Sequence, residues 1–320
     1  MKLTDFKPGA KFDNFPLLLK NAAVQKTKTD KTFLDAELSD GETSVRAKFW
    51  DWDAARETPQ AGAVFAFAGR CEEFAGAMQI VLSAINPAPP GEDDPARFLP
   101  CAPRPIQDML GDINRAVRNI ADEKIRDIVA KIVGDNVLFR NFAAAPASLR
   151  LHHAEIGGLL HHVSDMLRVA RALSGIYPFL DSDLLVAGVI LHDIGKLREL
   201  SFNASGLADD YSAEGRLLGH IVIGAQILRD TAAALGISGE TVMLLEHVIL
   251  SHHGQREFGS PILPQTPEAL ALNLIDTLDA KMFQSAAALA GVNPGAFSAK
   301  VYALDNRQMY KPDCDYRNPD

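Results

Sequence analysis

Cysteine is scarce in this chain of 320 residues, whose three thiols belong to Cys71, Cys101 and Cys314. Thiols so far apart support neither a disulfide framework nor a zinc knuckle built on cysteine pairs. The sequence also has no apolar run near the roughly 20 residues that span a bilayer, and its first residues lack the apolar core of a signal peptide. These absences exclude the disulfide-rich secreted class, argue against a membrane partner and predict a cytoplasmic protein.

Histidine is absent from the first 151 residues, and all nine histidines lie in the part that follows. They are His152, His153, His161, His162, His192, His220, His247, His252 and His253. Asp193 directly follows His192, and no cysteine lies nearby. Imidazole and carboxylate without thiolate are typical of a hydrolytic site that uses a divalent metal. The asymmetry predicts a chemically active region joined to a region with another task.

The net charge of −9 argues at first against a nucleic-acid partner, because phosphate binding depends largely on Lys and Arg. The acidity is unevenly spread, however. Residues 1–90 carry 11 Lys and Arg against 12 Asp and Glu, whereas residues 91–320 carry 21 against 29. The N-terminal part is therefore nearly neutral, and bound metal would offset part of the acidity elsewhere.

Residues 15–85 have the pattern of five short strands separated by turn residues, which predicts a small closed or half-open barrel. Alternation along the third strand places Arg46, Lys48 and Trp50 together on one face. A cationic and aromatic face of this kind suits the stacking and phosphate contacts of single-stranded nucleic acid. Packing at the end of the barrel is the alternative role for Trp50.

Seven prolines between residues 86 and 105 predict an extended linker. Beyond it the apolar period becomes helical, and helices are expected near 105–121, 122–134, 155–174, 182–192, 213–235, 239–252 and 267–290. The sequence thus predicts a multidomain α and β protein, with a small N-terminal β-barrel followed by a mainly α-helical domain. The expected divisions are a barrel at 1–88, a linker at 89–105, a helical domain at 106–292 and a tail of unassigned role at 293–320.

The first ligand candidate lies on the helix expected at 155–174. His162 follows the apolar stripe with Leu159 and Met166, whereas His161 falls on the polar side with Asp165. His162 is therefore the inward histidine of the pair and the better candidate.

His192 and Asp193 end a strongly apolar helix, where Gly195 lets the chain turn away and Lys196 projects from the turn. Adjacent side chains point about 100° apart on a helix, so the pair can hold one metal while an aspartate oxygen reaches a second. Lys196 is either an ordinary lysine at a helix end or a contact to a phosphate oxygen.

Further candidates follow on later apolar helices, at His220, at His252-His253, and at Asp276 and Asp279. The two aspartates share one helical face and interrupt an apolar surface. Such carboxylates are unfavourable unless something pairs with them, and a metal would do so. His247 is isolated, and we expect it to be an ordinary hydrogen-bonded core residue.

Together these motifs resemble a known family. The ordered set of His162, His192-Asp193 and Asp276 is similar to the HD superfamily of metal-dependent phosphohydrolases, and the later histidines resemble its binuclear branch. Closer similarity, over about residues 12–290, is to the YhaM-type 3′-5′ exoribonucleases, which also carry an N-terminal OB-fold. The motifs that carry it are HHAEIGGLLHHVSDMLRVA, LLVAGVILHDIGKLREL, GRLLGHIVIGAQIL, ILSHHGQREFGSP and LIDTLDAKM.

The resemblance implies an OB-like barrel, an HD domain and two divalent ions. The first ion would be held by His162, His192, Asp193 and Asp276, and the second by Asp193, His220, His252 and His253. Asp193 and Lys196 would act in catalysis, and substrate would contact His152, His153, Arg46, Lys48 and Trp50. Nitrogen and oxygen donors suit Mn²⁺ best, with Co²⁺, Fe²⁺ and Mg²⁺ as alternatives.

The implied activity is the removal of nucleotides from the 3′ end of single-stranded RNA, with single-stranded DNA as a further substrate. One alternative is a phosphodiesterase for cyclic dinucleotides or small nucleotides, although no Gly-Tyr-Pro signature follows the paired histidines. The other is a nucleic-acid-binding adaptor with a structural metal domain, which an intact ligand set disfavours. Assembly into a homo-oligomer and a contribution of Asp279 are left open.

Overall fold

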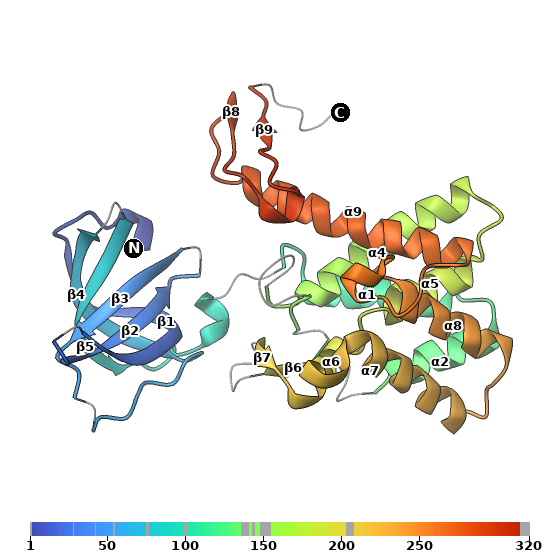
Figure 1. The fold of residues 1–320 in the computed structure, drawn as a ribbon, viewed down its shortest axis with the longest axis horizontal. Coiled ribbons are helices and arrows are strands. Elements are labelled where there is room, and N and C mark those ends of the chain that lie inside the picture. Colours follow the sequence, from blue (N-terminus) through green and yellow to red (C-terminus); the bar gives the residue numbers. More distant parts are fainter. Residues whose placement is uncertain are drawn as a thin grey trace. The chain divides into compact units, whose positions relative to one another are not determined.

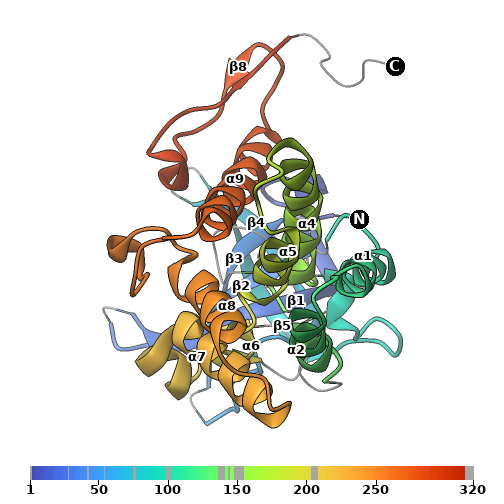
Figure 2. The same cartoon turned by 90° about the vertical axis from the view of Figure 1, so that its right-hand side faces the viewer.

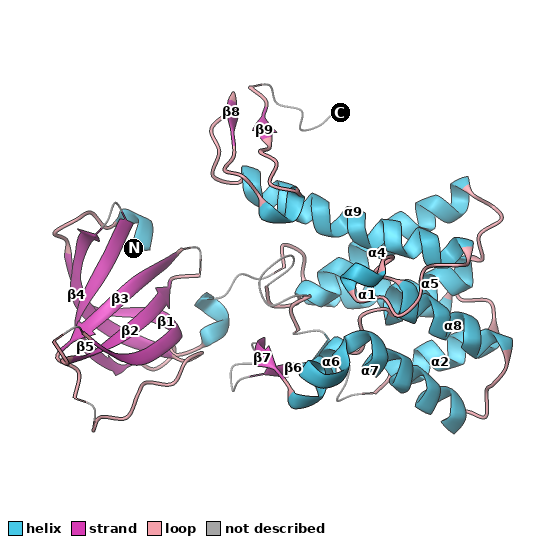
Figure 3. Cartoon of the chain, in the orientation of Figure 1, coloured by secondary structure: helices cyan, strands magenta, loops and turns pink. Residues whose placement is uncertain are grey.

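The computed structural model describes residues 2–27, 29–41, 43–53, 55–74, 77–98, 102–135, 141–142, 145–147, 155–202 and 208–313. By its internal contacts the chain divides into two units, each of which is treated by itself. One comprises Met1–Cys101 and Phe202–Leu207, and the other comprises Ala102–Ser201 and Ala208–Asp320. Strands dominate the first unit and helices the second (Figure 3).

The first unit is a closed five-stranded barrel, as the sequence predicts (Figure 1). Its strands are β1 (Lys11–Lys26), β2 (Thr32–Ser39), β3 (Ser44–Trp50), β4 (Val64–Phe74) and β5 (Ala77–Pro87). They follow the order β1-β2-β3-β5-β4, and only the pairing of β3 with β5 is parallel among these neighbours. A small OB-like barrel is therefore confirmed.

Alternation along the strands decides which side chains fill the barrel. Leu34 and Leu38 of β2 and Ala47 of β3 are fully buried among the apolar residues of the interior. Every second residue of these strands points outward, and on that face Arg46 lies opposite Glu37 and Lys48 lies opposite Asp35 across the strand pair. The predicted cationic face exists, but acidic residues of β2 stand beside it.

Part of the proline-rich segment is folded against the barrel. The short helix η2 (Pro95–Phe98) lies within it, and the ring of Phe98 packs in a small apolar cluster with Leu18 and Val64. An aromatic ring among the prolines explains why the chain turns back here rather than staying extended.

The helices of the second unit lie close to the residue ranges that the apolar periodicity of the sequence predicts. They are α1 (Ile106–Arg118), α2 (Glu123–Val133), α4 (Gly158–Ile176), α5 (Ser182–Leu191), α6 (Lys196–Glu199), α7 (Ala213–Ala234), α8 (Glu240–Ser251) and α9 (Pro267–Leu289). The short strands β6 (Leu200–Phe202) and β7 (Ala208–Tyr211) form a two-stranded sheet. None of the helices in the described residues is both long and apolar enough to cross a membrane.

Helix α5 is the centre of the helical unit, where it lies among the other helices (Figure 2). Residues 184–191 are all buried, which an apolar run of this length requires. Asp181 begins the helix by accepting hydrogen bonds from the backbone N–H groups of Asp183 and Leu184. The helix packs on α4, α8 and α9, and its last residue directly precedes His192.

After α9 the chain forms a small hairpin of β8 (Ala296–Phe297) and β9 (Tyr310–Lys311). Leu304, in the segment that connects the two strands, is buried. The amino group of Lys311 donates a hydrogen bond to the carbonyl of Leu289 at 3.3 Å. The described part of the C-terminal tail is thereby attached to the end of α9.

Close packing of α5 on α8 depends on Gly188. A Cβ atom there would lie 2.5 Å from Cγ1 of Val248, which is so close that the valine side chain or one of the helices would have to shift. In an open helical position the change from Gly to Ala stabilises by about 1 kcal/mol. At this position we expect Gly188→Ala instead to lower the free energy of unfolding, by roughly 1–3 kcal/mol, because of overpacking.

Chemical denaturation would measure this effect, with Gly175→Ala as the control, since a Cβ at Gly175 of α4 meets no atom within 4 Å. In a Val248→Ala background, the loss caused by Gly188→Ala should shrink. An equal loss in both backgrounds would show that contact with Val248 is not the cause.

Candidate metal centre

The predicted ligands come from five helices of the second unit and converge in two groups. His162 lies in the first turn of α4, His192 and Asp193 follow α5, His220 lies in α7, His252 and His253 follow α8, and Asp276 lies in α9. The ligand atoms of His162, His192 and Asp193 are all within 4.8 Å of one another. Those of His220, His252 and His253 satisfy the same limit, so each group could hold one cation.

Asp193 lies between the two groups and is only 2% exposed. Its Oδ2 is 3.3 Å from Nε2 of His192 and 4.0 Å from Nε2 of His162. Its Oδ1 is 3.5 Å from Nε2 of His220 and 3.8 Å from Nε2 of His252. Each carboxylate oxygen thus faces one group, which is the geometry that a bridging ligand needs. Asp276 adds Oδ1 at 3.3 Å from Nε2 of His162.

Every histidine of the centre has its Nδ1 atom beside an oxygen. The partners are Asp279 Oδ2 for His162 (2.6 Å), Val189 O for His192 (2.9 Å), Glu199 Oε1 for His220 (3.0 Å), Ile249 O for His252 (2.7 Å) and Phe258 O for His253 (2.7 Å). Carbonyl and carboxylate oxygens accept hydrogen bonds, so in each ring Nδ1 must donate. The Nε2 atoms are then left to face the centre, as in histidines that bind metals.

The donor set fits a divalent cation. The Nε2 atoms of His192, His220 and His252 and the Oδ1 atom of Asp193 are buried without a hydrogen-bond partner among the described residues. Buried acceptors without partners are unfavourable by about 1–3 kcal/mol each. A cation at each group would coordinate these lone pairs, and their nitrogen and oxygen chemistry suits a borderline divalent metal.

Electrostatics prepares the imidazoles as ligands. Burial holds the pKa of His252 well below its ordinary value, and burial also lowers the pKa of His253. Both rings are therefore neutral near pH 7, with a lone pair available on Nε2. Burial opposes ionisation of Asp193, but the charge of Lys196 foremost outweighs it, and the pKa of Asp193 stays well below the usual range.

His162 differs because two carboxylates face it. Burial lowers its pKa, but the hydrogen bonds and charges of Asp276 and Asp279 outweigh burial and raise the pKa to about 9. A proton on this ring therefore occupies the position that a cation would take, and metal binding would release it.

Whether Asp279 contributes to the site is left open by the sequence. In the structure it contacts Nδ1 of His162, on the side of the ring away from the ligand atom Nε2. Glu199 is absent from the residues that the sequence predicts. Its only sequence signal is a carboxylate between Leu197 and Leu200, both buried, shortly after the His192-Asp193 motif.

Lys196 does not project freely from its turn. Its amino group donates to Oδ2 of Asp193 at 2.7 Å, and its side chain is only 12% exposed. The contact to a phosphate oxygen that was expected of Lys196 stays a prediction.

Two other histidines lie apart from the metal centre. His161 was expected on a polar face, but it is buried, with Nδ1 3.0 Å from Glu155 Oε1 and Nε2 3.3 Å from Asp165 Oδ2. The hydrogen bond to Asp165 contributes most, and together with that to Glu155 it raises the pKa of His161 to about 9. The ring is therefore protonated at neutral pH. His247 accepts a hydrogen bond from the backbone N–H of Gln265 at 2.9 Å.

The predicted substrate contacts His152 and His153 lie outside the described residues. In the barrel, the amino group of Lys48 lies 5.1 Å from the ring centroid of Trp50 and 5.7 Å from that of Phe74. Trp50 is 41% exposed, whereas Trp52 is buried in the barrel core. Trp52 packs inside the barrel, whereas Trp50 packs on the ring of Phe33 at 5.0 Å between centroids and is also partly exposed to solvent, so its role in stacking stays a prediction.

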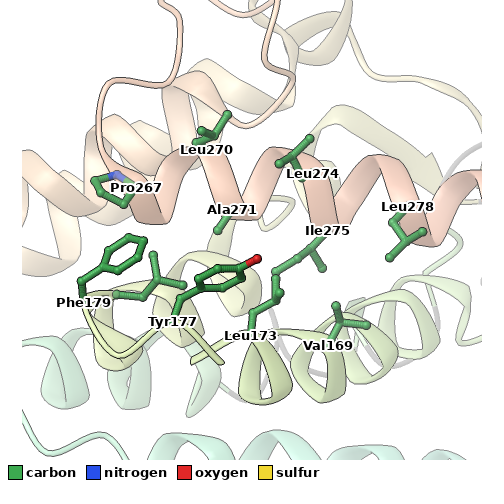
Figure 4. A pocket seen from close by; sticks show the side chains of 11 residues that line it. Val169, Leu173, Tyr177, Phe179, Pro267, Leu270, Ala271, Leu274, Ile275 and Leu278 are labelled. Carbon is green, nitrogen blue, oxygen red and sulfur yellow. The ribbon is translucent and has the colours of Figure 1, made fainter. Parts of the chain in front are cut away.

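A separate apolar groove lies between the C-terminal part of α4 and α9 (Figure 4). Its volume is about 420 Å³. The lining residues are Val169, Leu173, Tyr177, Phe179, Leu180, Pro267, Leu270, Ala271, Leu274, Ile275 and Leu278. None of these is charged and none is a predicted ligand, so the groove offers nothing to balance the charge of a phosphodiester.

Comparison with known proteins gives consistent results. The HD domain family model matches residues 159–281. The chain is 38% identical over 309 residues to 3′-5′ exoribonuclease YhaM of Bacillus subtilis, with 95% of this chain and 96% of the relative covered. It is also 38% identical over 297 residues to 3′-5′ exoribonuclease YhaM of Halalkalibacterium halodurans, with 92% and 91% covered.

A solved structure of the HD domain of L. monocytogenes phosphodiesterase PgpH is 19% identical and covers 50% of this chain and 76% of its own. Its TM-score is 0.31, which adds nothing to the description of the fold.

The two groups of ligands predict two Mn²⁺ ions per chain after loading and dialysis, measured by inductively coupled plasma mass spectrometry. His252→Ala should leave one ion, because it removes a buried ligand from one group only. His247→Ala, in α8 shortly before His252 but outside the centre, should keep both. One ion in the unmodified protein, or equal loss in the two variants, would contradict the two-ion assignment.

Proposed function

The chain belongs to the YhaM family of 3′-5′ exoribonucleases, and from this premise we propose how its residues release nucleotides from the 3′ end of RNA. It is a metal-dependent 3′-5′ exoribonuclease with an HD domain. The observation that carries the proposal is the buried carboxylate of Asp193, whose two oxygens each face one group of imidazoles.

We assign His162, His192 and Asp276 to one ion, His220, His252 and His253 to the other, and Asp193 to both. When bound, a pair of divalent ions supplies a polarised water and offsets the charge that develops on the phosphoryl oxygens. The protein contributes rigid placement, since the Nδ1 atom of each ligand ring is held by an oxygen. Lys196 orients Asp193 through its 2.7 Å bond, and its remaining N–H groups are available to a phosphate oxygen.

Mn²⁺ is the proposed metal. Five imidazoles and two carboxylates make a borderline set, which suits Mn²⁺, Co²⁺ and Fe²⁺, whereas Mg²⁺ prefers a shell of oxygen ligands and keeps several waters. Mg²⁺ is therefore the weakest of the four candidates.

The barrel is proposed to hold the single strand by stacking on Trp50 and Phe74, with Lys48 and Arg46 near the phosphates. Glu37 and Asp35 lie opposite these cations, so stacking rather than charge is the main contribution. Stacking and phosphate contacts do not require a 2′-hydroxyl, which extends the proposal to single-stranded DNA. Assembly into a homo-oligomer stays a prediction, and light scattering of the purified protein would decide it.

The activity is tested with 5′-labelled single-stranded RNA and, separately, a cyclic dinucleotide, each with Mn²⁺. A descending ladder from the RNA agrees with the proposal. Hydrolysis of the cyclic dinucleotide alone would favour a small-nucleotide phosphodiesterase, and binding without turnover would favour an adaptor.

Asp193→Ala is expected to abolish turnover while RNA binding is largely retained. Charge stabilisation by the ions is worth several kcal/mol, and each 1.36 kcal/mol is about tenfold in rate, so we expect a loss of roughly 100-fold or more. Asp210→Asn, in a surface ion pair with Arg216, is the control and should keep its activity. Full activity of Asp193→Ala would refute the ligand assignment.

Trp50→Ala should raise KM for long single strands by roughly 5-fold to 100-fold, because stacking of one base is worth about 1–3 kcal/mol. KM for a trinucleotide should change little, because so short a strand gains least from a stacking surface outside the metal centre. Phe179→Ala, another exposed aromatic residue, is the control. Equal effects of Trp50→Ala on both substrates would remove the case for the barrel as a guide for RNA.

A further inference from the structure

Helix α7 is interrupted immediately before the ligand His220. Gly219 has φ 72° and ψ 155°, a backbone conformation that ends one helical segment and lets another begin. At the start of a helical segment the backbone N–H groups have no partner within the helix. The N–H of His220 is one of these groups, and it donates to Oε1 of Glu199 at 3.0 Å.

The same oxygen of Glu199 also accepts from the ring of His220. The distance from Nδ1 to Oε1 is 3.0 Å, and both side chains are only 12% exposed. One atom thus fixes the backbone and the ring of one histidine. With these two points held, Nε2 of His220 faces Oδ1 of Asp193 at 3.5 Å.

Glycines allow α6 to approach α7 closely enough for this contact. A Cβ atom on Gly195 would lie 2.0 Å from the carbonyl oxygen of His220, and a Cβ on Gly215 would lie 2.2 Å from the carbonyl oxygen of Glu199. Both close neighbours are backbone atoms, which cannot move aside as a flexible side chain can. Glu199 is therefore built into the packing of these two helices.

Two of the five ligand histidines are held by a carboxylate and three by a backbone carbonyl. The carboxylates are Asp279 at His162 and Glu199 at His220, so each group of ligands contains one such pair. A carboxylate fixes the ring and makes its other nitrogen a stronger donor to metal, more than a neutral carbonyl does.

We propose that Glu199 is the positioning residue of the group formed by His220, His252 and His253, and that it sets the affinity of that group for its divalent ion. The inference rests on the metal ligands assigned under the proposed function. Asp279 is its counterpart for the other group and supplies a matched control.

The test measures metal affinity without turnover, by isothermal titration of metal-free protein with Mn²⁺. His162→Ala weakens the group of His162, so the affinity measured for the remaining tightly bound ion is that of the group of His220. In that background, Glu199→Ala should lower the affinity about 10-fold to 100-fold, the usual effect of losing such a partner. In the His252→Ala background, where the group of His162 reports, Glu199→Ala should leave the affinity unchanged.

Asp279→Ala should give the opposite pattern, with a loss in the His252→Ala background and none in the His162→Ala background. Glu199→Gln keeps an oxygen acceptor for both N–H groups of His220 but loses the negative charge, so it should lose part of the affinity of this group, less than Glu199→Ala loses. A residue that only supports α7 would lower the melting temperature of the metal-free protein and weaken both groups alike.

Each outcome bears on a separate claim. If His162→Ala and His252→Ala do not each remove one ion, the ligand assignment is wrong. If they do, but Glu199→Ala has no effect or the same effect in both backgrounds, only the inference about Glu199 is overturned. Should Glu199→Ala fail to fold, Glu199→Gln decides: a loss of affinity confined to the group of His220 supports the inference, whereas no loss, or an equal loss in both groups, overturns it.

Discussion

The helical unit is organised around acceptor atoms that face one another. Asp193, with 2% of its surface exposed, meets imidazole nitrogens from α5, α7 and α8 whose lone pairs point toward its own oxygens. Such a cluster does not hold itself together, so the surrounding helices must be fixed by other contacts. The buried run of α5, the close approach at Gly188 and the backbone contacts at Gly195 supply them. The apolar packing therefore maintains a geometry that a divalent cation at each group would stabilise.

Much of this arrangement is visible in the sequence because it obeys simple periods. Alternation gives the strands of the barrel, and the 3.6-residue repeat gives the helices to within a few residues at either end. The ligand candidates stand at inward or terminal positions of those helices, so periodicity finds them as well. Trp50 and Trp52 show the limit of the method, since both lie near the end of β3 and only the fold decides which of them is buried.

The remaining features depend on contacts that no local pattern encodes. Glu199 reaches His220 across 21 positions, by way of a break at Gly219 that interrupts the helical period. Asp276 and Asp279 share one helical face, and which of them faces Nε2 of His162 is a matter of a few ångströms. His161 is buried despite its polar neighbours, because Glu155 and Asp165 each accept from one ring nitrogen. For His220 and His162 the charged partner comes from a distant part of the chain, whereas for His161 two nearby carboxylates pair with a ring that the tertiary packing buries.

The bond between Lys196 and Asp193 has a consequence for the charge balance of the buried centre. A buried carboxylate without a counter-ion is strongly unfavourable, and removing one partner of a buried pair is far more harmful than replacing both. The ammonium group of Lys196, on the next turn of the same chain, supplies that counter-ion from within. The polypeptide therefore carries its own counter-ion for the carboxylate that joins the two ligand groups, and a divalent ion bound there would share Oδ2 with that ammonium group.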